Sequence, residues 1–399
     1  MSEIGFPASP LSRRPPGERR NGARQPADSL ATLSPAEATA SIDGWRDLAT
    51  RSAEANVFFH PGFLLPAIDH LDPTVAVATV RGGDGDLVAL APVVSARLGK
   101  IAPATRIWVH DYGPLGSPLV DPSTLGTAAD GMIRCAGAGS LVIPDLPLQG
   151  PVATALIEAA TRAGRPCEVV DEHARAVLHR RGDSLADSRA ALATGRRKEL
   201  ARQMRRLGDL GAVTIETATN HDRVRARFEE FLVLEMDSWK GEAGTALASR
   251  AATAAFAREV VFNRSERGTV RIVSIRLGDK PVAIVVCFVA GATAYTWKIA
   301  HDARFARYSP GAQLMLEAGD SLLADPAIAS VDSCASANHP MIDALWRDRI
   351  ALGTLVVGPV GGGALYRIGL AACRGEIAAR ATAKTLRARL KQTHGARRP

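Results

Sequence analysis

Apolar and polar residues follow one another in an order that occurs twice along the chain. In the first half, helical spacing leads into two strand-like runs separated by a GGDGD turn, and then into a helix, a strand and a helix. These predicted elements span, in order, residues 42–49, 58–71, 75–81, 87–98, 123–138, 140–146 and 151–163. The pattern predicts helices, an antiparallel β meander and a helix–strand–helix unit.

The second half repeats this order. Two helical patterns precede three strand-like runs, and a helix starting at Ser309, a strand, a helix starting at Pro340 and a last strand follow. The predicted elements span residues 221–237, 247–265, 269–277, 282–290, 292–300, 309–322, 329–335, from 340 onward, and 354–358. Because strands and helices alternate in both halves, we expect two similar α/β domains joined near residue 190.

Composition sets the outer boundaries of these domains. Residues 1–36 are rich in Pro, Arg, Ser and Gly with little apolar clustering, so we expect a disordered tail there. The first domain then covers residues 37–190, the second covers residues 191–360, and residues 361–399 form a basic C-terminal tail.

The net charge of +8 comes entirely from that tail. Residues 363–399 contain nine Lys or Arg and one acid, Glu376, so residues 1–362 carry 40 basic and 40 acidic residues. A neutral body argues against a nucleic-acid footprint over the whole surface, and we expect no DNA partner. Two interpretations of the tail are open: a solvated helix, or contact with an anionic surface such as lipid, RNA or an acidic protein.

Targeting and cysteine patterns favour a cytoplasmic protein. No run of about eighteen apolar residues occurs, and the opening MSEIGFPASPLSRRPPGERRNG lacks the apolar core of a secretory signal. The five cysteines are scattered without CxxC spacing. This favours reduced thiols and indicates neither a disulfide framework nor a metal site.

A basic segment at residues 194–211 joins the two halves. Leu200, Met204 and Leu207 form one narrow apolar stripe of a predicted helix. Six cations cover the rest of it: Arg196, Arg197, Lys198, Arg202, Arg205 and Arg206. Two interpretations are open, a bridging helix with a solvated basic face or a helix whose cations bind the phosphates of a ligand.

The helix start at Ser309 has the features of an anion site. Ser309 is a favourable N-cap, Pro310 suits the first helical position, and Gly311 lets a ligand approach the backbone. The free N–H groups of the first turn, which continues through Ala312 and Gln313, favour an anion together with the helix dipole. Because this helix follows a strand, the site would lie at a carboxyl end of the sheet, where ligands often bind. An ordinary helix cap is the alternative.

A carboxylate interrupts an apolar stripe upstream. The stripe through Phe228, Phe231 and Leu232 continues at Glu235, so this side chain should be buried and either ion-paired or shifted in pKa. The helical pattern then ends, and a glycine-rich loop carries Trp239 and Lys240. This loop is either a substrate wall or a surface connection.

Further polar residues follow the strands of the second half. Trp297 and Lys298 end one strand, and Asp302 lies in the loop after it. Asp332 interrupts the next strand, and Asn338 and His339 precede the helix at Pro340. If the two strands are neighbours, Lys298 and Asp332 lie on adjacent strand ends, where a buried ion pair is the alternative to catalysis.

Taken together in order, these motifs resemble a known family. FLVLEMDSWKGEAGTAL, AYTWKIAHDARFARYSPGAQLMLE and VDSCASANHPMIDALW look like the bacterial GNAT-fold acetyltransferases of the CelD (cellulose biosynthesis) type, which are close to BioF-like acetyltransferase domains and to the Fem group. The resemblance covers residues 195–358. It implies an α/β fold of two tandem GNAT-like (acyl-CoA N-acyltransferase) domains, each a mixed central sheet flanked by helices, with the N-terminal one degenerate.

The same resemblance implies an acyl-CoA co-substrate, acetyl-CoA or a longer one. From the cysteine pattern we expect no metal. The loop and helix after the fourth strand of such a domain hold the cofactor pyrophosphate, a role that falls here to residues 308–313. RYSPGA has one glycine where the common loop reads Q/R-x-x-G-x-G/A. The strand before it would contact the cofactor through Trp297, Lys298, Ile299 and Ala300. Fem-type relatives use aminoacyl-tRNA as donor, which gives an alternative reading with a tRNA partner.

Direct transfer from a thioester to an amine needs a base, an oxyanion donor and an acid. Our candidates are Glu235 or Asp332 as base, a backbone N–H within residues 297–300 for the oxyanion, and Tyr308 as acid. Trp239, Lys240, Asp302, Asn338 and His339 are candidates for binding the acceptor. We expect this acceptor to be an amine of a small molecule, an amino sugar or a polysaccharide precursor. A non-catalytic accessory protein of exopolysaccharide production is the third possibility.

Overall fold

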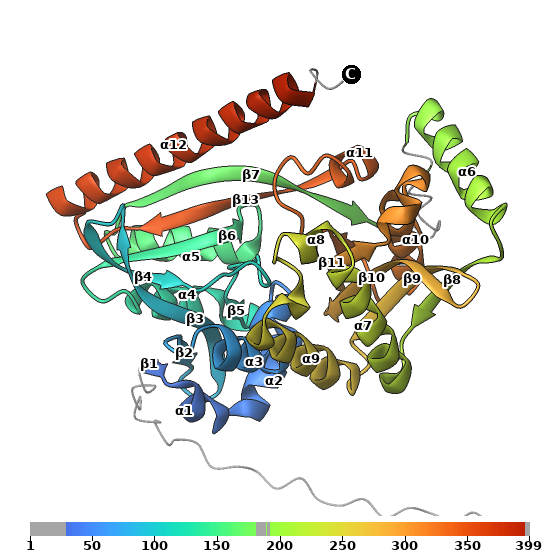
Figure 1. Cartoon of the computed structure of the whole chain (residues 1–399). Helices are drawn as coiled ribbons and strands as arrows, with labels where there is room; N and C mark the ends of the chain where they lie inside the picture. Colours follow the sequence, from blue (N-terminus) through green and yellow to red (C-terminus); the bar gives the residue numbers. More distant parts are fainter. Residues whose placement is uncertain (1–28, 181–188, 190–191, 396–399) are drawn as a thin grey trace, which may run out of the picture.

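A computed structural model describes residues 29–180, 189 and 192–395 (Figure 1). The first half begins with β1 (Ser29–Leu33), α1 (Pro35–Thr39), α2 (Ile42–Arg51), the 3-10 turn η1 (Val57–Phe59), α3 (Pro61–Leu71), β2 (Ala76–Arg81), β3 (Leu87–Leu98) and β4 (Ala102–Ile107). It continues with β5 (Leu119–Val120), η2 (Pro122–Thr124), α4 (Leu125–Arg134), β6 (Ser140–Pro147), α5 (Pro151–Arg162) and β7 (Cys167–His179).

The second half follows the same order. It begins with α6 (Thr194–Gly208), β8 (Val213–Ala218), α7 (His221–Met236), α8 (Trp239–Glu242), η3 (Leu247–Ser249), α9 (Ala251–Ser265), β9 (Val270–Leu277) and β10 (Lys280–Ala290). It continues with β11 (Thr293–His301), η4 (Ala303–Tyr308), α10 (Pro310–Leu323), β12 (Ser330–Asp332), α11 (Ile342–Leu345), β13 (Asp348–Val357) and α12 (Ala364–Gly395).

Strands from both halves form one continuous mixed sheet in the described chain. Its order is β1-β2-β3-β4-β6-β13-β7-β12-β11-β10-β9-β8, with β5 paired to β3. In each half an antiparallel meander ends in a parallel pair, β4 with β6 and β11 with β12. The last strands are exchanged, because β7 of the first half pairs with β12 and β13 of the second half pairs with β6. The fold is thus mixed α/β in two tandem halves, as predicted, and the halves share the centre of the sheet.

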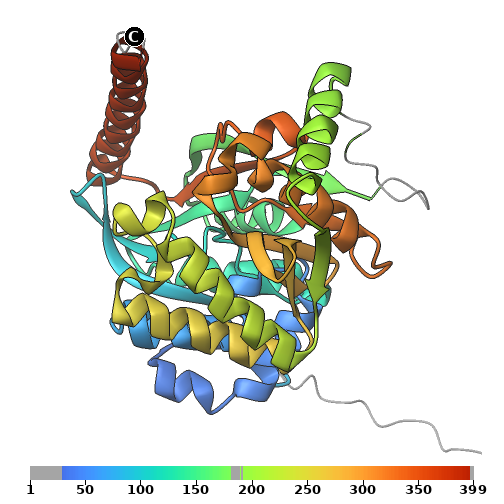
Figure 2. The ribbon, with the colours of Figure 1, turned by 45° about the vertical axis from the view of Figure 1, so that its right-hand side comes forward.

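Helices cover both faces of the second half of this sheet. Side chains along β10 alternate, so that Ile284, Val286 and Phe288 join one core cluster with α7 and α9, whereas Val285 and Cys287 join another with α6 and α10. This alternation follows from the two-residue period of a strand. Figures 1 and 2 both show α7 and α9 side by side on one face.

An aromatic cluster joins the halves. Phe63 on α3 of the first half is fully buried and lies edge-on to Phe256, Phe288 and Trp297 of the second half, with ring centroids 5.5, 5.7 and 6.0 Å away. Its neighbour Phe58 contacts the ring of Tyr295 at 5.5 Å. These edge-to-face contacts add to the burial of large apolar surface and fix the first half against β10 and β11.

The basic tail begins as a long helix that docks on the first half. Tyr366 and Leu370 of α12 are buried in one cluster with residues of β3, β4, β6, β7 and β13, and the helix then runs away from the body (Figure 2). Close approach requires Gly99, whose φ of 55° is left-handed and whose added Cβ would lie 2.2 Å from the Gly369 carbonyl oxygen. The helical interpretation of the tail is confirmed over Ala364–Gly395.

Two sequence expectations on the fold need correction. Residues 29–36 form β1 and the start of α1 instead of a disordered tail, because Leu30 and Leu33 pack on the core beside β2; residues 1–28 lie outside the described residues. The strands β4, β7 and β8 were missing from the expected elements. Their burial alternates poorly, so they carry no clear two-residue period.

Candidate functional site

The parallel pair β11–β12 opens at the site. β12 pairs with β11 only through Thr293–Tyr295. Within the described chain, the following residues of β11 therefore pair with β10 on one side and have no strand on the other. The register with β10 shifts, since Val286 opposes Lys298 while Cys287 opposes Thr296, and Trp297 is the extra residue of a β-bulge. Such bulges re-aim backbone and side-chain groups next to active sites.

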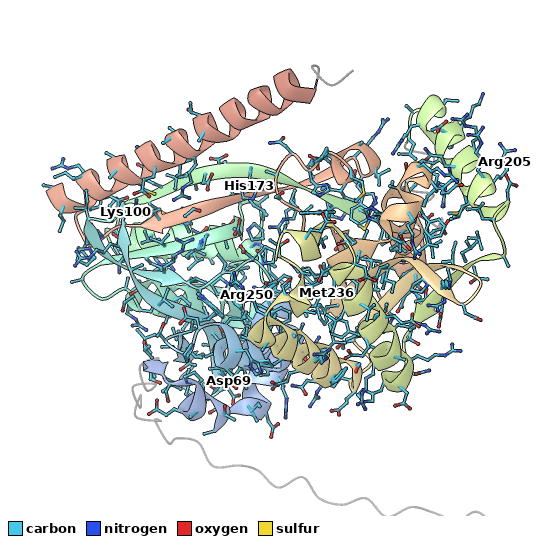
Figure 3. All side chains as sticks on the ribbon, viewed as in Figure 1. Asp69, Lys100, His173, Arg205, Met236 and Arg250 are labelled. Atoms are coloured by element: carbon cyan, nitrogen blue, oxygen red, sulfur yellow. The ribbon has the colours of Figure 1, made fainter. Side chains whose placement is uncertain are left out.

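Lys240 and Glu235 form an ion pair against this strand. Glu235, at the end of α7, is 1% exposed, and its carboxylate accepts hydrogen bonds from Lys240 Nζ at 2.9 Å and from the Leu247 N–H at 2.8 Å. Lys240 Nζ also donates to the carbonyl oxygen of Ile299 at 2.7 Å. The prediction that Glu235 is buried is confirmed, and its charge is paired as a buried carboxylate requires. Lys240 thereby ties the segment between Met236 and Arg250, both labelled in Figure 3, to β11.

Lys298 is a second lysine at the same point, and its charge lacks a carboxylate at ion-pair distance among the described residues. Its Nζ lies 4.5 Å from the centre of the Tyr112 ring, a cation–π contact. Burial, and next the positive charge of Lys240, lower the pKa of Lys298 to about 8. A large part of this lysine is therefore neutral near pH 8, which makes it able to accept a proton.

The loop after β4 brings first-half residues to the site. Trp297 Nε1 donates to the carbonyl oxygen of Tyr112 at 2.8 Å, and the Asp111 and Tyr112 side chains interact electrostatically with Lys298 or Glu235. Burial, and then the charge of Lys298, lower the pKa of His110 to about 4. We did not expect these residues from the sequence. The polar and aromatic run WVHDYG after a strand was the signal for them.

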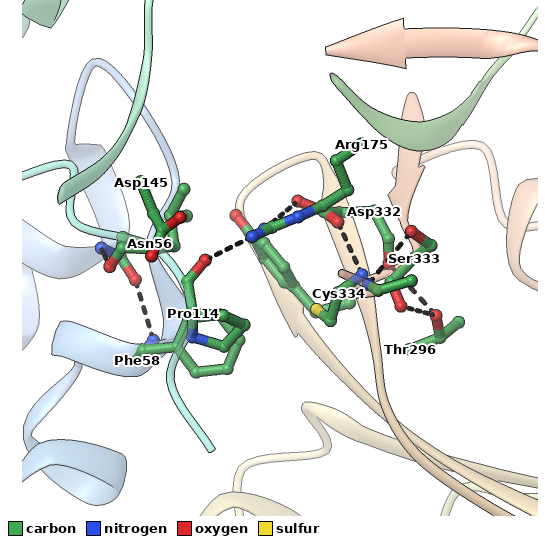
Figure 4. A network of polar contacts seen from close by, with 12 residues as sticks. Asn56, Phe58, Pro114, Asp145, Arg175, Thr296, Asp332, Ser333 and Cys334 are labelled. Atoms are coloured by element: carbon green, nitrogen blue, oxygen red, sulfur yellow. Dashed lines mark hydrogen bonds and ion pairs between the residues drawn. The ribbon is translucent and has the colours of Figure 1, made fainter. Parts of the chain in front are cut away.

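Asp332 is held by an arginine rather than by Lys298. As expected, β12 neighbours β11, with Asp332 opposite Tyr295. Its carboxylate accepts from Arg175 Nη1 at 3.4 Å and from the Cys334 N–H at 2.7 Å (Figure 4). The alternative interpretation, a buried Lys298–Asp332 ion pair, is therefore wrong, because β7 pairs with β12 and places Arg175 on the same face.

The start of α10 differs from the predicted cap. Ser309 is the N-cap residue, but it is left-handed at φ 51° and its side chain makes no capping hydrogen bond. A Cβ added to Gly311 would lie 3.5 Å from Met341 Sδ, so this turn is covered by the loop after β12. Gln313 is buried and donates to the Leu200 carbonyl oxygen of α6 at 2.5 Å. An incoming anion would have to displace the flexible Met341 side chain.

A cavity opens between α6 and α10 beside that turn. Its volume is about 260 Å³, and it is lined by Arg197, Arg205 and Gln313 together with apolar residues of both helices. Figure 3 shows Arg205 on the outer helix α6. All six cations predicted on α6 are exposed. The hydrogen bond from Gln313 to Leu200 places this basic helix beside the first turn of α10.

The other predicted site residues lie around these groups at varying depth. Tyr308 is buried in the core beneath α6, with the Arg307 guanidinium 4.8 Å from its ring centre. Asp302 pairs with Arg304 on the far side of α7, in a cleft of about 700 Å³. Trp239 is 62% exposed on α8. Asn338 and His339 lie in the loop after β12, where His339 Nδ1 accepts from the Ile342 N–H at 3.4 Å.

A known protein family matches most of the second half. Residues 194–339 match the model of the acetyltransferase (GNAT) domain family. These residues contain α7, the β9–β11 meander, the opened β11–β12 pair and α10, so the GNAT match and the site coincide. No curated protein matches the chain significantly.

Solved structures of the same fold cover most of the chain. One is the C-terminal domain of a protein described as a lysylphosphatidylglycerol synthetase from Agrobacterium fabrum, with a TM-score of 0.53 and 15% identity over 84% of this chain and 96% of that one. Another is FemX, with a TM-score of 0.51 and 11% identity over 84% and 98%. At such identities the likeness shows the fold alone. The GNAT match applies to residues 194–339, and the chain as a whole shares with these structures a mixed α/β fold, built here from two tandem halves.

Within the described residues, neither a metal site nor a membrane span is found. No three His, Cys, Asp or Glu side chains are grouped to hold a metal ion. None of the helices in this part of the chain has both the length and the apolar character to cross a bilayer.

Proposed function

We propose that this protein is an N-acyltransferase that moves an acetyl or longer acyl group from acyl-CoA to an amine. The observation that carries the proposal is the β-bulge at Trp297, where β11 leaves β12 and a lysine with a pKa of about 8 follows directly. Backbone N–H groups freed at this point would stabilise the oxyanion, and Lys298 would serve as base. The acceptor class is a small molecule, an amino sugar or a polysaccharide precursor.

Lys298 alone can carry out both proton transfers of the reaction. The amine nitrogen attacks the thioester carbon, neutral Lys298 takes a proton from that nitrogen, and the C–S bond breaks. Protonated Lys298 then returns the proton to the leaving thiolate, so that amide and thiol are formed. Glu235 keeps both carboxylate oxygens bonded to Lys240 and to the Leu247 N–H, which makes it a positioning residue in this scheme. Tyr308 is then not required as acid.

The donor's phosphates would lie at the first turn of α10. The helix dipole and the N–H groups of Gly311 and Ala312 favour an anion, and Arg197 and Arg205 line the adjoining cavity. Gly311 is buried beneath Met341, His301 and Ile299, so the donor would have to displace Met341 to reach the backbone of this turn. The place of Arg197 and Arg205 supports both interpretations of the basic helix, as a bridge between the halves and as a phosphate-binding element.

The CelD or BioF-like assignment and a link to exopolysaccharide production rest on the motifs of the second half. A second candidate function is transfer from aminoacyl-tRNA. Six exposed cations on α6, standing over the α10 turn, favour it, since RNA phosphates would meet this helix as readily as those of CoA. A non-catalytic accessory role is the third.

Thermal unfolding with each donor separates these candidates. Acetyl-CoA at about one hundred times its Kd is expected to stabilise the protein by about 2.7 kcal/mol and to raise its Tm. Pantetheine, which lacks the nucleotide phosphates, should stabilise it less. Stabilisation by tRNA alone, lost steeply with added salt, would select the second candidate, and no shift with any donor would select the accessory role.

A further inference from the structure

Only one face of α12, over its first turns, packs on the body of the protein. Tyr366, Leu370, Cys373 and Ile377 form this face, and residues 378–383 are all exposed. Past Ile377 the helix continues to Gly395, about 27 Å at 1.5 Å per residue, and Figure 2 shows it projecting from the body. An isolated helix of this length is marginally stable in water, so a surface that binds it would also stabilise it.

Apolar side chains are exposed around the base of this helix. Leu365 and Ile368 on α12 are 51% and 55% exposed, and Val360 in the turn before it is 75% exposed. Ile101, 40% exposed, lies in the β3–β4 turn, against which α12 docks. These are four of the ten large apolar side chains that are exposed in the described part of the chain, so apolar surface is concentrated at this corner.

The projecting part of α12 continues this apolar stripe in its sequence. Leu386 follows Ile368 after about five helical turns, so the two positions have the same angle around the helix axis. The stripe and the packed face therefore lie on different sides of α12, because Ile368 is exposed while Tyr366 and Leu370 are buried.

The same helix carries positive charge that its own acid does not neutralise. Glu376 pairs with Lys100 of the β3–β4 turn, labelled in Figure 3, at 3.1 Å and with Arg380 at 3.5 Å. Arg374 pairs with Glu168 of β7 at 2.9 Å. After these pairs, residues 384–399 contain six Lys or Arg and no acid. A partner that matches this charge is negative.

Exposed apolar side chains beside a run of cations fit a membrane surface. We propose that α12 docks on a bilayer that contains anionic phospholipid, with its cations at the headgroups and Leu365, Ile368 and Ile101 at the boundary with the acyl chains. Basic helices are attracted to anionic leaflets, and apolar side chains beside the cations add burial. This inference is independent of the proposed acyl transfer.

The other occupants fit the same surface less well. RNA phosphates would match the cations but would leave the exposed leucine and isoleucine side chains in water. A second copy of α12 would bring two helices of the same charge together, which electrostatic repulsion opposes.

Co-sedimentation of the full chain with vesicles tests the docking. Binding to vesicles of phosphatidylcholine and phosphatidylglycerol in equal amounts is expected to be at least about tenfold stronger than to phosphatidylcholine alone, and to weaken with added salt. A variant in which glutamine replaces four cations of α12 should bind the mixed vesicles at least about tenfold more weakly. These substitutions are Lys384→Gln, Arg387→Gln, Arg389→Gln and Lys391→Gln.

The basic helix α6 provides the matched control for charge. A variant with glutamine at four of its exposed cations loses the same net charge and should bind the mixed vesicles within about twofold of the unchanged protein. These substitutions are Arg196→Gln, Arg197→Gln, Lys198→Gln and Arg206→Gln.

A second pair of variants tests the apolar contact without changing charge. Leu365→Ser combined with Ile368→Ser should weaken binding to the mixed vesicles about tenfold, because two apolar side chains lose their burial. Leu210→Ser combined with Ile215→Ser removes two side chains that are 51% and 47% exposed away from α12, and should leave binding unchanged. All four side chains are exposed, so the Tm should stay the same in both variants.

Four results would overturn the proposal: no binding to the mixed vesicles, equal binding to both kinds of vesicle, equal losses in the α12 and α6 charge variants, or full binding by the Leu365→Ser, Ile368→Ser protein. Binding of tRNA in place of vesicles, lost in the α12 charge variant and kept in the serine variant, would assign the helix to RNA instead. If the vesicles bind as expected while no acyl donor raises the Tm, the membrane contact stands and the proposed transferase function fails.

Discussion

Replacing Lys298 with methionine is expected to reduce acyl transfer by about 10² to 10⁴-fold, the range by which a positioned general base accelerates proton transfer. Methionine keeps the length and apolar packing of the side chain but cannot accept a proton. The expected loss is in kcat, since the donor phosphates bind elsewhere in our scheme. Release of CoA with a saturating amine measures it.

The pH profile gives the second readout of this variant. A base acts in its neutral form, so the rate of the unchanged protein should fall about tenfold per pH unit below the Lys298 pKa of about 8 and level off above it. Lys298→Arg keeps the positive charge but stays protonated, so it should be as inactive as methionine.

A lysine elsewhere on the sheet provides the control. Lys280 is exposed at the start of β10, and Lys280→Met should retain full activity. An active Lys298→Arg protein would mean that only the charge matters, and an active Lys298→Met protein would remove Lys298 from the mechanism.

Phe63→Ala is expected to cost about 3–5 kcal/mol of unfolding free energy, the usual loss for a fully buried phenylalanine. The ring belongs to the first half but packs on Phe256, Phe288 and Trp297 of the second. Its removal leaves a cavity at the joint between the halves and beside the bulge. Urea denaturation followed by fluorescence measures the loss.

Phe262→Ala is the matched control for this prediction. That ring is only partly buried on α9, beneath the Arg225 guanidinium, so its removal should cost clearly less. Because the halves share one sheet, the Phe63→Ala protein should still unfold in a single transition. Two separate transitions would show that the halves are independent domains. Equal losses of unfolding free energy in the two variants would show that Phe63 does not hold the halves together.

Local patterns in the sequence predicted most elements of each half. The order of meander, helix, strand and helix was recoverable because continuous apolar runs such as VAIVVCFVA predict strands buried on both faces, and stripes such as that of α7 predict helices buried on one face. The exchange of β7 and β13 was not, since it depends on pairing between segments far apart in the chain. A local pattern does not determine which of two similar strands will pair with a given sheet edge.

The site, like the fold, was predictable where it depends on local patterns and not where it depends on long-range contacts. Burial of Glu235 followed from its place on an apolar stripe, but its partner Lys240 follows a break in the helix, so spacing alone did not pair them. Arg175 reaches Asp332 only because of the strand exchange. The contribution of Tyr112 depends on the packing of the first half against β11, a long-range tertiary contact that local sequence patterns do not reveal.

The central claim is that donor phosphates bind at the first turn of α10 while the acyl group lies along the free edge of β11. Hydrogen–deuterium exchange of the whole protein, with and without saturating acetyl-CoA, tests it most directly. Slower exchange in the amides of residues 297–313 is the result that our account predicts. Unchanged exchange there, in a sample whose raised Tm shows that acetyl-CoA is bound, would contradict it.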